Sequence, residues 1–215
     1  MPFSNKWQRN DKGPGFMGKI KDTVKPPTPI KVQIETASRQ IRVLIAQLDG
    51  AVTRVRQRDQ TIFAKIVASL AKHDAEHASV YANELSEVRK VGKVVTQASL
   101  ALEQIVLRLA TITDLGEIAT TLAPAVAVIK SMKVGLGSAL PEADKEIGEI
   151  SGLLSGILVE AGSVSGFSLN FEAANEDAQK VLDEAAAVAE QRMEESFPQI
   201  PAGVGGQNQQ EAQNA

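Results

Sequence analysis

The feature that most constrains this chain is a helical apolar repeat from about residue 30 to about residue 115. Apolar residues recur there at steps of three and four, without a proline, which places one apolar stripe on a helix. The polar sequence Lys72-His73-Asp74 interrupts the stripe, and a second stripe of the same period follows it. The sequence therefore predicts two long helices, about 30–72 and 74–115, that fold back on each other as an antiparallel hairpin.

Each helix of this hairpin would be roughly 60 Å long at 1.5 Å per residue. Such a rod must bury its apolar stripe against its partner, the rest of the chain or further copies of itself. Aromatic residues make up 4% of the sequence, so the core must be built from Ala, Val, Ile and Leu, which suits helix-on-helix packing. There is no cysteine, which excludes disulfides and thiolate chemistry. We expect an all-α fold.

Three smaller helices are predicted after the hairpin, over about 118–133, 142–160 and 169–195. The joints between them are expected at Gly116, at Gly135, Gly137 and Pro141, and over 162–168. Glycine costs a helix roughly 1 kcal/mol relative to alanine, so the first two of these helices should be weaker than the hairpin.

Charge is unevenly divided along the chain. Residues 1–110 contain 18 basic and 10 acidic residues, whereas residues 111–215 contain 5 basic and 16 acidic ones. This asymmetry indicates an anionic partner for the basic half and self-association between the two halves. Two solvated faces of a helical bundle are the alternative.

A basic row is predicted on the first hairpin helix. Its members project within roughly 40° of one another, at 100° per residue, beside the apolar stripe. They are Arg54, Arg58, Lys65 and Lys72. A rod with one basic face can lie along a membrane or another acidic surface, although any single member is equally well explained as a solvated side chain.

The first 29 residues form a basic arm in which bulky apolar side chains alternate with lysines. The residues expected to contact a membrane are Phe3, Trp7, Phe16, Lys19, Lys21 and Lys25. The rings would enter the headgroup boundary, and the lysines would meet anionic lipid. A flexible basic arm is the alternative. We expect no nucleic-acid partner, because no base-reading motif accompanies these charges.

The sequence His73-Asp74-Ala75-Glu76-His77 matches the H-x-x-E-H pattern of inverted zinc proteases and contains both histidines of the chain. In that chemistry the two histidines bind zinc and the glutamate activates water. Here the pattern straddles the predicted hairpin tip, where no pocket is implied. We therefore predict no enzyme activity and no metal or cofactor, and keep a zinc hydrolase as a lesser alternative.

A proline-rich peptide, Phe197-Pro198-Gln199-Ile200-Pro201, follows the last predicted helix. Two prolines spaced by three preset an extended peptide, which suits a groove on a partner. The alternative is a helix stop before a tail without function. The Gly, Gln and Asn composition of 202–215 predicts disorder.

In the order and spacing of its segments, the chain from about 30 to 165 resembles the ESCRT-III family, and within it the CdvB-like archaeal cell-division proteins. The segments that carry the resemblance are Arg54-Val-Arg-Gln-Arg-Asp59, Ile62-Phe63, Tyr81-Ala-Asn-Glu-Leu-Ser86, Val88-Arg89-Lys90, Leu100-Ala-Leu-Glu103, Leu107-Arg-Leu109 and Asp114-Leu115-Gly116.

The resemblance implies a subunit that polymerises into filaments on membranes, alone or with paralogues, and is disassembled by a Vps-type AAA ATPase. That ATPase grips short C-terminal motifs with its MIT domain. Phe197, Pro198, Ile200 and Pro201 fit the family's proline-rich motif, with Phe where Leu is usual. The implied location is cytoplasmic, peripheral on the inner face of the cell membrane at division sites.

Four regions follow from this interpretation: the basic arm 1–29, an ESCRT-III-like core 30–165, an acidic regulatory helix 166–196, and the motif with its tail 197–215. A phage-shock-type membrane-stress coat protein remains an alternative, because it shares the hairpin and the membrane role. Such a protein would not need the proline-rich peptide, so ATPase binding separates the two interpretations.

Overall fold

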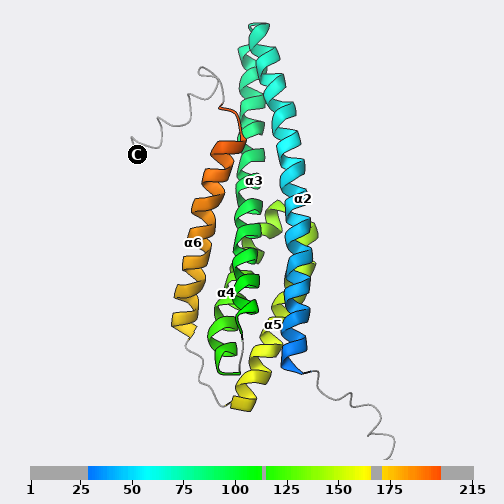
Figure 1. Ribbon diagram of the computed structural model, residues 1–215. Helices are drawn as coiled ribbons and strands as arrows, with labels where there is room; N and C mark the ends of the chain where they lie inside the picture. The colour runs from blue at the N-terminus through cyan, green and yellow to red at the C-terminus, as the bar shows by residue number, and fades with distance from the viewer. Residues whose placement is uncertain (1–28, 113–114, 166–170, 200–215) are drawn as a thin grey trace, which may run out of the picture.

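The computed structural model describes residues 29–112, 115–165 and 171–199. Within these residues the fold is all-α, with no strand, as predicted. Figure 1 shows a long hairpin flanked over part of its length by three shorter helices. The elements are α2 (Ile30–Ala71), α3 (Ala75–Ala110), α4 (Leu115–Ala139), the 3₁₀ turn η1 (Pro141–Ala143), α5 (Asp144–Ser165) and α6 (Phe171–Ser196).

The hairpin reverses at Lys72-His73-Asp74, as the sequence predicts. His73 takes a left-handed backbone conformation with φ 56°, the conformation that often ends a helix. Asp74 is the N-cap of α3, because its Oδ1 accepts a hydrogen bond from the His77 backbone N–H at 3.1 Å. The turn is therefore made by local backbone chemistry.

Two polar pairs show that α2 and α3 keep one antiparallel register. The Ser99 hydroxyl donates to Asp49 Oδ1 at 2.9 Å, and Arg89 Nε donates to Asp59 Oδ1 at 2.5 Å. The partners of each pair are equally distant in sequence from Asp74, by 25 residues in one pair and by 15 in the other. The helices therefore lie side by side without slippage from the tip downwards.

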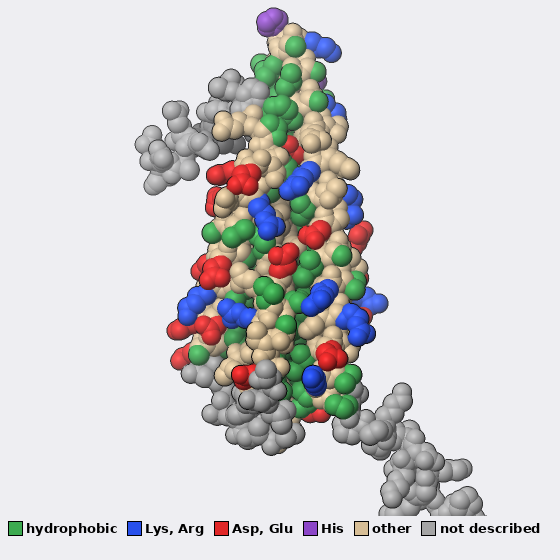
Figure 2. All heavy atoms as spheres, viewed as in Figure 1, with side chains coloured by type: hydrophobic (Ala, Val, Ile, Leu, Met, Phe, Trp, Pro, Cys, Tyr) green, Lys and Arg blue, Asp and Glu red, His purple; other side chains and the backbone are tan. Residues whose placement is uncertain are grey.

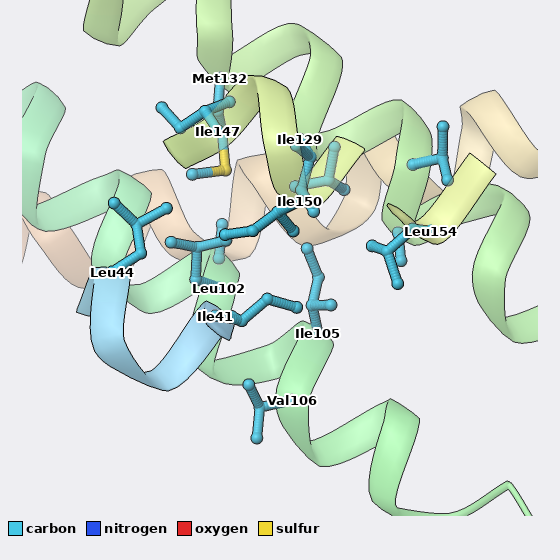
Figure 3. Packing of buried hydrophobic residues seen from close by; sticks show 14 of the residues in the cluster. Ile41, Leu44, Leu102, Ile105, Val106, Ile129, Met132, Ile147, Ile150 and Leu154 are labelled. Atoms are coloured by element: carbon cyan, nitrogen blue, oxygen red, sulfur yellow. The ribbon is translucent and has the colours of Figure 1, made fainter. Parts of the chain in front are cut away.

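Beside the half of the hairpin far from the tip, the other helices complete a bundle. Helix α5 packs on α2 and α4, while α6 packs on α3 and α4. Figure 3 shows aliphatic side chains of α2, α3, α4 and α5 converging on one core. Its fully buried members include Ile41, Leu102, Ile129, Ile147 and Ile150.

Helix α4 is longer than predicted. It begins at Leu115 and continues through Gly135 and Gly137 to Ala139, so the joint lies at Leu140 and Pro141. Two glycines cost this helix roughly 2 kcal/mol relative to alanine, but burial of Met132 and Leu136 on the same helix offsets that cost. Tertiary packing therefore moved this boundary.

Helix α5 also differs from its predicted bounds. It continues to Ser165, past Gly162, which the sequence placed in a linker. Buried Ala161 holds its last turns against the core.

The stretch Glu117–Gly137 of α4 is long and apolar enough to cross a membrane, and 44% of it is buried in the bundle. A core helix of a soluble protein passes the same test, so this is weak evidence for a span.

Candidate interaction surfaces

The basic row lies at the seam between α2 and α3. Arg54, Arg58, Lys65 and Lys72 are all exposed. Arg58 Nη2 lies 2.8 Å from Glu84 Oε1, and Lys65 Nζ lies 5.4 Å from the centre of the Tyr81 ring. Sequence reasoning found the row but not these partners on α3. They balance part of its charge without covering it.

The acidic helix α6 is held to α3 and α4 mainly by apolar contact. Its buried side consists of small aliphatic residues: Ala174, Ala178, Val181, Ala185 and Ala189. Two polar contacts with α3 supplement these. Lys93 Nζ lies 3.3 Å from Glu190 Oε1, and Gln97 Nε2 donates to the Leu182 carbonyl at 3.2 Å. Charge attraction is therefore a minor part of what docks α6.

The proline-rich peptide begins on the hairpin. The Phe197 side chain is buried, and the Arg89 guanidinium lies 5.5 Å from the centre of its ring. Arg89 Nη2 also donates to the Pro198 carbonyl at 2.8 Å, and the Phe197 N–H donates to the Met193 carbonyl. A cation over an aromatic face is attractive by about 0.5–2 kcal/mol. The first two motif residues are thus docked in the same chain.

Arg89 also pairs with Asp59, whose exposed fraction is 0%. The buried carboxylate therefore anchors the guanidinium that holds Phe197 and Pro198. Both residues belong to segments that carry the family resemblance, but the sequence alone predicts no role for either. A signal was present, because Asp59 follows Val55 by four residues and thus interrupts the apolar stripe of α2.

At Gly92 three helices come close together. A Cβ added there would lie 3.0 Å from Val55 Cγ1 of α2 and 3.2 Å from Met193 Cε of α6. An added methyl group would therefore need Val55 and Met193 to shift by a few tenths of an ångström, because α2 and α6 approach closely beside Arg89. Val55, Gly92 and Met193 consequently lie at one level along the rod.

The H-x-x-E-H residues do not form a metal site. His73, Glu76 and His77 are exposed at the hairpin tip, where His77 Nδ1 lies 2.8 Å from Asp74 Oδ2. Hydrogen bonds from the His77 side chain and backbone lower the pKa of the Asp74 carboxyl below its usual value. No group of three His, Asp or Glu side chains in the described part of the chain is placed to hold a metal ion. The geometry thus gives the zinc-hydrolase alternative no support.

Several predicted site residues lie outside the described residues. They are Phe3, Trp7, Phe16, Lys19, Lys21 and Lys25 of the basic arm, and Ile200 and Pro201 of the motif. Their roles in membrane contact and ATPase binding stay predictions.

Comparison with known proteins identifies relatives along almost the whole chain. The chain is 38% identical over 200 residues to Cell division protein B1 of Sulfolobus acidocaldarius, which covers 93% of this chain and 90% of the relative. It is 29% identical over 175 residues to Cell division protein B of the same organism, which covers 80% of this chain and 67% of that relative. No protein-family model matches the chain. No solved structure gives a significant match.

Proposed function

Because the chain belongs to the CdvB-like, archaeal branch of the ESCRT-III cell-division proteins, we propose that it is a filament-forming subunit that remodels membranes during division or scission. The single observation that carries the proposal is the pairing of a projecting helical hairpin with a C-terminal motif docked on it. A non-enzymatic, mechanical role fits this architecture.

The hairpin is the assembly unit in this proposal. Its tip extends past the end of α6, as Figure 1 shows. There α2 and α3 share a small separate cluster of Ile62, Ile66, Ala82 and Leu85. A long two-helix projection of this kind offers side surfaces to other copies and to paralogous subunits.

The C-terminal motif is the proposed handle for a Vps-type AAA ATPase. Its MIT domain would bind the extended peptide from Phe197 to Pro201. While α6 is docked, Arg89 holds Phe197 and Pro198, so full engagement requires their release. We propose that only this end of the chain detaches, which exposes the motif to the ATPase while the rest of α6 stays docked.

Membrane contact is assigned to the basic arm and to the basic hairpin face. The arm contributes Phe3, Trp7 and Phe16 with Lys19, Lys21 and Lys25, which combine apolar anchors with cations. We propose a cytoplasmic location, peripheral on the inner face of the cell membrane at division sites. No nucleic-acid role is proposed.

The ATPase role is tested by binding of the full chain to an isolated MIT domain of the cognate ATPase. Ile200→Asp puts a charge at an apolar motif position and should abolish capture without changing assembly. Gln199→Asp is the matched control, since it places the same charge at the polar position and should leave capture intact. Retained binding by Ile200→Asp would refute the role and favour the phage-shock interpretation.

The membrane role is tested by sedimentation with anionic liposomes. Deleting residues 170–215 removes α6 and the motif with nine acidic and two basic residues, and should increase the pelleted fraction because less acidic charge repels the anionic lipid. Neutral liposomes serve as the control, because they lack the charge that attracts lysine and arginine. Unchanged sedimentation with anionic liposomes after the deletion would contradict a restraint of membrane binding by the acidic C-terminal region.

A further inference from the structure

Helices α6 and α2 have the strongest net charges, of opposite sign, but they do not pack mainly against each other. Helix α6 contains 8 acidic and 2 basic residues, and α2 contains 7 basic and 3 acidic ones. Helix α6 nevertheless packs on α3 and α4, and α3 contains four residues of each sign. Figure 2 shows acidic side chains gathered along the α6 edge and basic ones mainly along the α2 edge. The molecule therefore has an acidic and a basic edge.

The acidic edge contains a regular row. Its members are Glu172, Glu176, Asp183 and Glu190, separated by steps of four, seven and seven residues. At 100° per residue they lie within roughly 40° of one another. The buried face of α6, which includes Val181 and Ala185, lies roughly on the opposite side of the helix. The row therefore points away from the molecule's own core.

The basic row on α2 has the same spacing. Arg54, Arg58, Lys65 and Lys72 are also separated by steps of four, seven and seven residues. Each row is about 27 Å long at 1.5 Å per residue. The two helices run in the same direction, from the broad end of the molecule towards the hairpin tip (Figure 1). Identical spacing on parallel helices allows one row to match the other, member by member.

The two rows face opposite sides of α3. Glu84, which pairs with Arg58 of the basic row, and Lys93, which pairs with Glu190 of the acidic row, both belong to α3. They are nine residues apart, or two and a half helical turns, and therefore lie on opposite faces. One molecule consequently cannot join its own rows, but two molecules can.

We propose that the acidic row on α6 of one copy binds the basic row on α2 of a second copy. This contact rests on the proposed filament function and assigns it a surface. In the match Glu176 faces Arg58 and Asp183 faces Lys65 of the other copy. Because the two contacting surfaces differ, a bound pair still presents an unoccupied acidic row on one copy and an unoccupied basic row on the other. Such a heterologous contact propagates into an open chain when the rotation does not close.

The contact also implies a stagger. Met193 of α6 lies level with Val55 of its own α2, through Gly92. Glu190, three residues earlier on α6, therefore lies level with Val52 of its own α2, but in the match it faces Lys72 of the other copy, twenty residues further on. Successive copies are therefore offset by about 30 Å along the rod. The receiving surface is the part of the hairpin near the tip, beyond the end of its own α6.

Charge selects this stagger over stacking without an offset. On the face of α2 that carries the basic row, the same steps begun five helical turns nearer the start of the helix contain Thr36, Gln40, Gln47 and Arg54, with a single charge. An acidic row gains little attraction there. Five members of the two rows already have partners within the chain: Arg58, Lys65, Glu172, Asp183 and Glu190. The ion pairs of Arg58 and Glu190 are exposed and weak enough to be shared.

The test uses full-length variants without liposomes, with assembly followed by sedimentation and electron microscopy at low and high salt. Glu176→Lys with Asp183→Lys reverses the acidic row, and Arg58→Glu with Lys65→Glu reverses the basic row. Each pair alone should raise the protein concentration needed for assembly at least about tenfold. High salt should weaken wild-type assembly in the same direction.

The decisive experiment mixes the two charge-reversed variants. A one-to-one mixture of the two variants should assemble again, because each acidic row then meets a basic row on the other variant. Glu184→Lys with Glu195→Lys is the matched control, since it changes the net charge equally on a different face of α6 and should assemble normally. Helicity by circular dichroism confirms that every variant is folded.

Three results would overturn the contact: reversed-row variants that assemble like the wild type, a mixture that stays unassembled, or a control that fails equally. If the wild type forms filaments in any of these cases, the filament function stands and this surface is wrong. If the folded wild type forms no filaments with or without anionic liposomes, the filament function and the contact are both refuted.

Discussion

The two ends of the hairpin have the same apolar period but different surroundings. At the broad end, α4, α5 and α6 cover the stripe, and residues such as Ile41 and Leu102 belong to a large shared core. Near the tip, α2 and α3 have only each other among the described helices, and the cluster around Ile66 and Leu85 is small. The same local pattern is thus a bundle core at one end and a two-helix projection at the other.

The two ends therefore serve different purposes: one stabilises the fold, and the other offers surfaces for binding. The broad end supplies most of the buried apolar area and therefore most of the folding free energy. The tip contributes less, but its sides stay open to other molecules. The buried Asp59–Arg89 pair stands at the border between the two regions, where α6 ends and the motif begins.

The largest expected effect compares one leucine from each end. Leu102→Ala should lower the free energy of unfolding by about 3–4 kcal/mol, because surrounding helices hold the cavity open. Leu85→Ala should cost about 2 kcal/mol, since two helices near solvent can relax around the gap. Urea denaturation measures both. Equal losses would remove the distinction between the two ends.

Substitution of Arg89 tests the ion pair with Asp59 at the border between the two regions. Arg89→Ala leaves the Asp59 carboxylate buried without its cation, which should cost about 2–3 kcal/mol after allowance for the partial exposure of Arg89. The same variant should bind an MIT domain more tightly, because Phe197 and Pro198 are released. Asp59→Leu with Arg89→Leu should recover stability while keeping the motif free. Weaker MIT binding by both variants would contradict the proposed release.

Two glycines distinguish covered from open helix faces. Gly152→Ala on α5 should raise the free energy of unfolding by up to about 1 kcal/mol, because its Cβ would meet nothing within 4 Å. Gly92→Ala should lose this gain, since its Cβ would press on Val55 and Met193. Thermal and urea unfolding compare the two. A gain at Gly92 equal to that at Gly152 would mean that α6 is not closely docked there.

The smallest effect concerns the tip itself. Asp74→Ala removes the N-cap of α3 and should speed amide hydrogen exchange near His77 without changing global unfolding. Because folding lowers the pKa of Asp74, its contribution is complete above pH of about 4 and is lost as the pH falls through the folded value. Exchange measured at several pH values should therefore converge with the wild type in acid. A difference that persists there would exclude the capping carboxylate as its cause.

The hairpin, its turn and the all-α class could all be predicted from the amino-acid sequence. These follow from periodicity and from one cap at Asp74, which act within a few residues. The order of the smaller helices was also predictable from the apolar period, and Pro141 marks one joint, but the glycines predicted as joints lie inside helices: Gly116, Gly135, Gly137 and Gly162. The basic row was predictable for the same reason, since helix geometry places residues four and seven apart on one side.

Only the tertiary structure decided which surfaces meet. The extension of α4 through Gly135 and Gly137 depends on a core supplied by other helices, which no local preference contains. Arg89 contacts Asp59, Phe197 and Pro198 at the same time. Arg89 and Pro198 are 109 residues apart in the sequence. Helix period orders residues along one element, whereas contacts between distant elements depend on how whole faces pack.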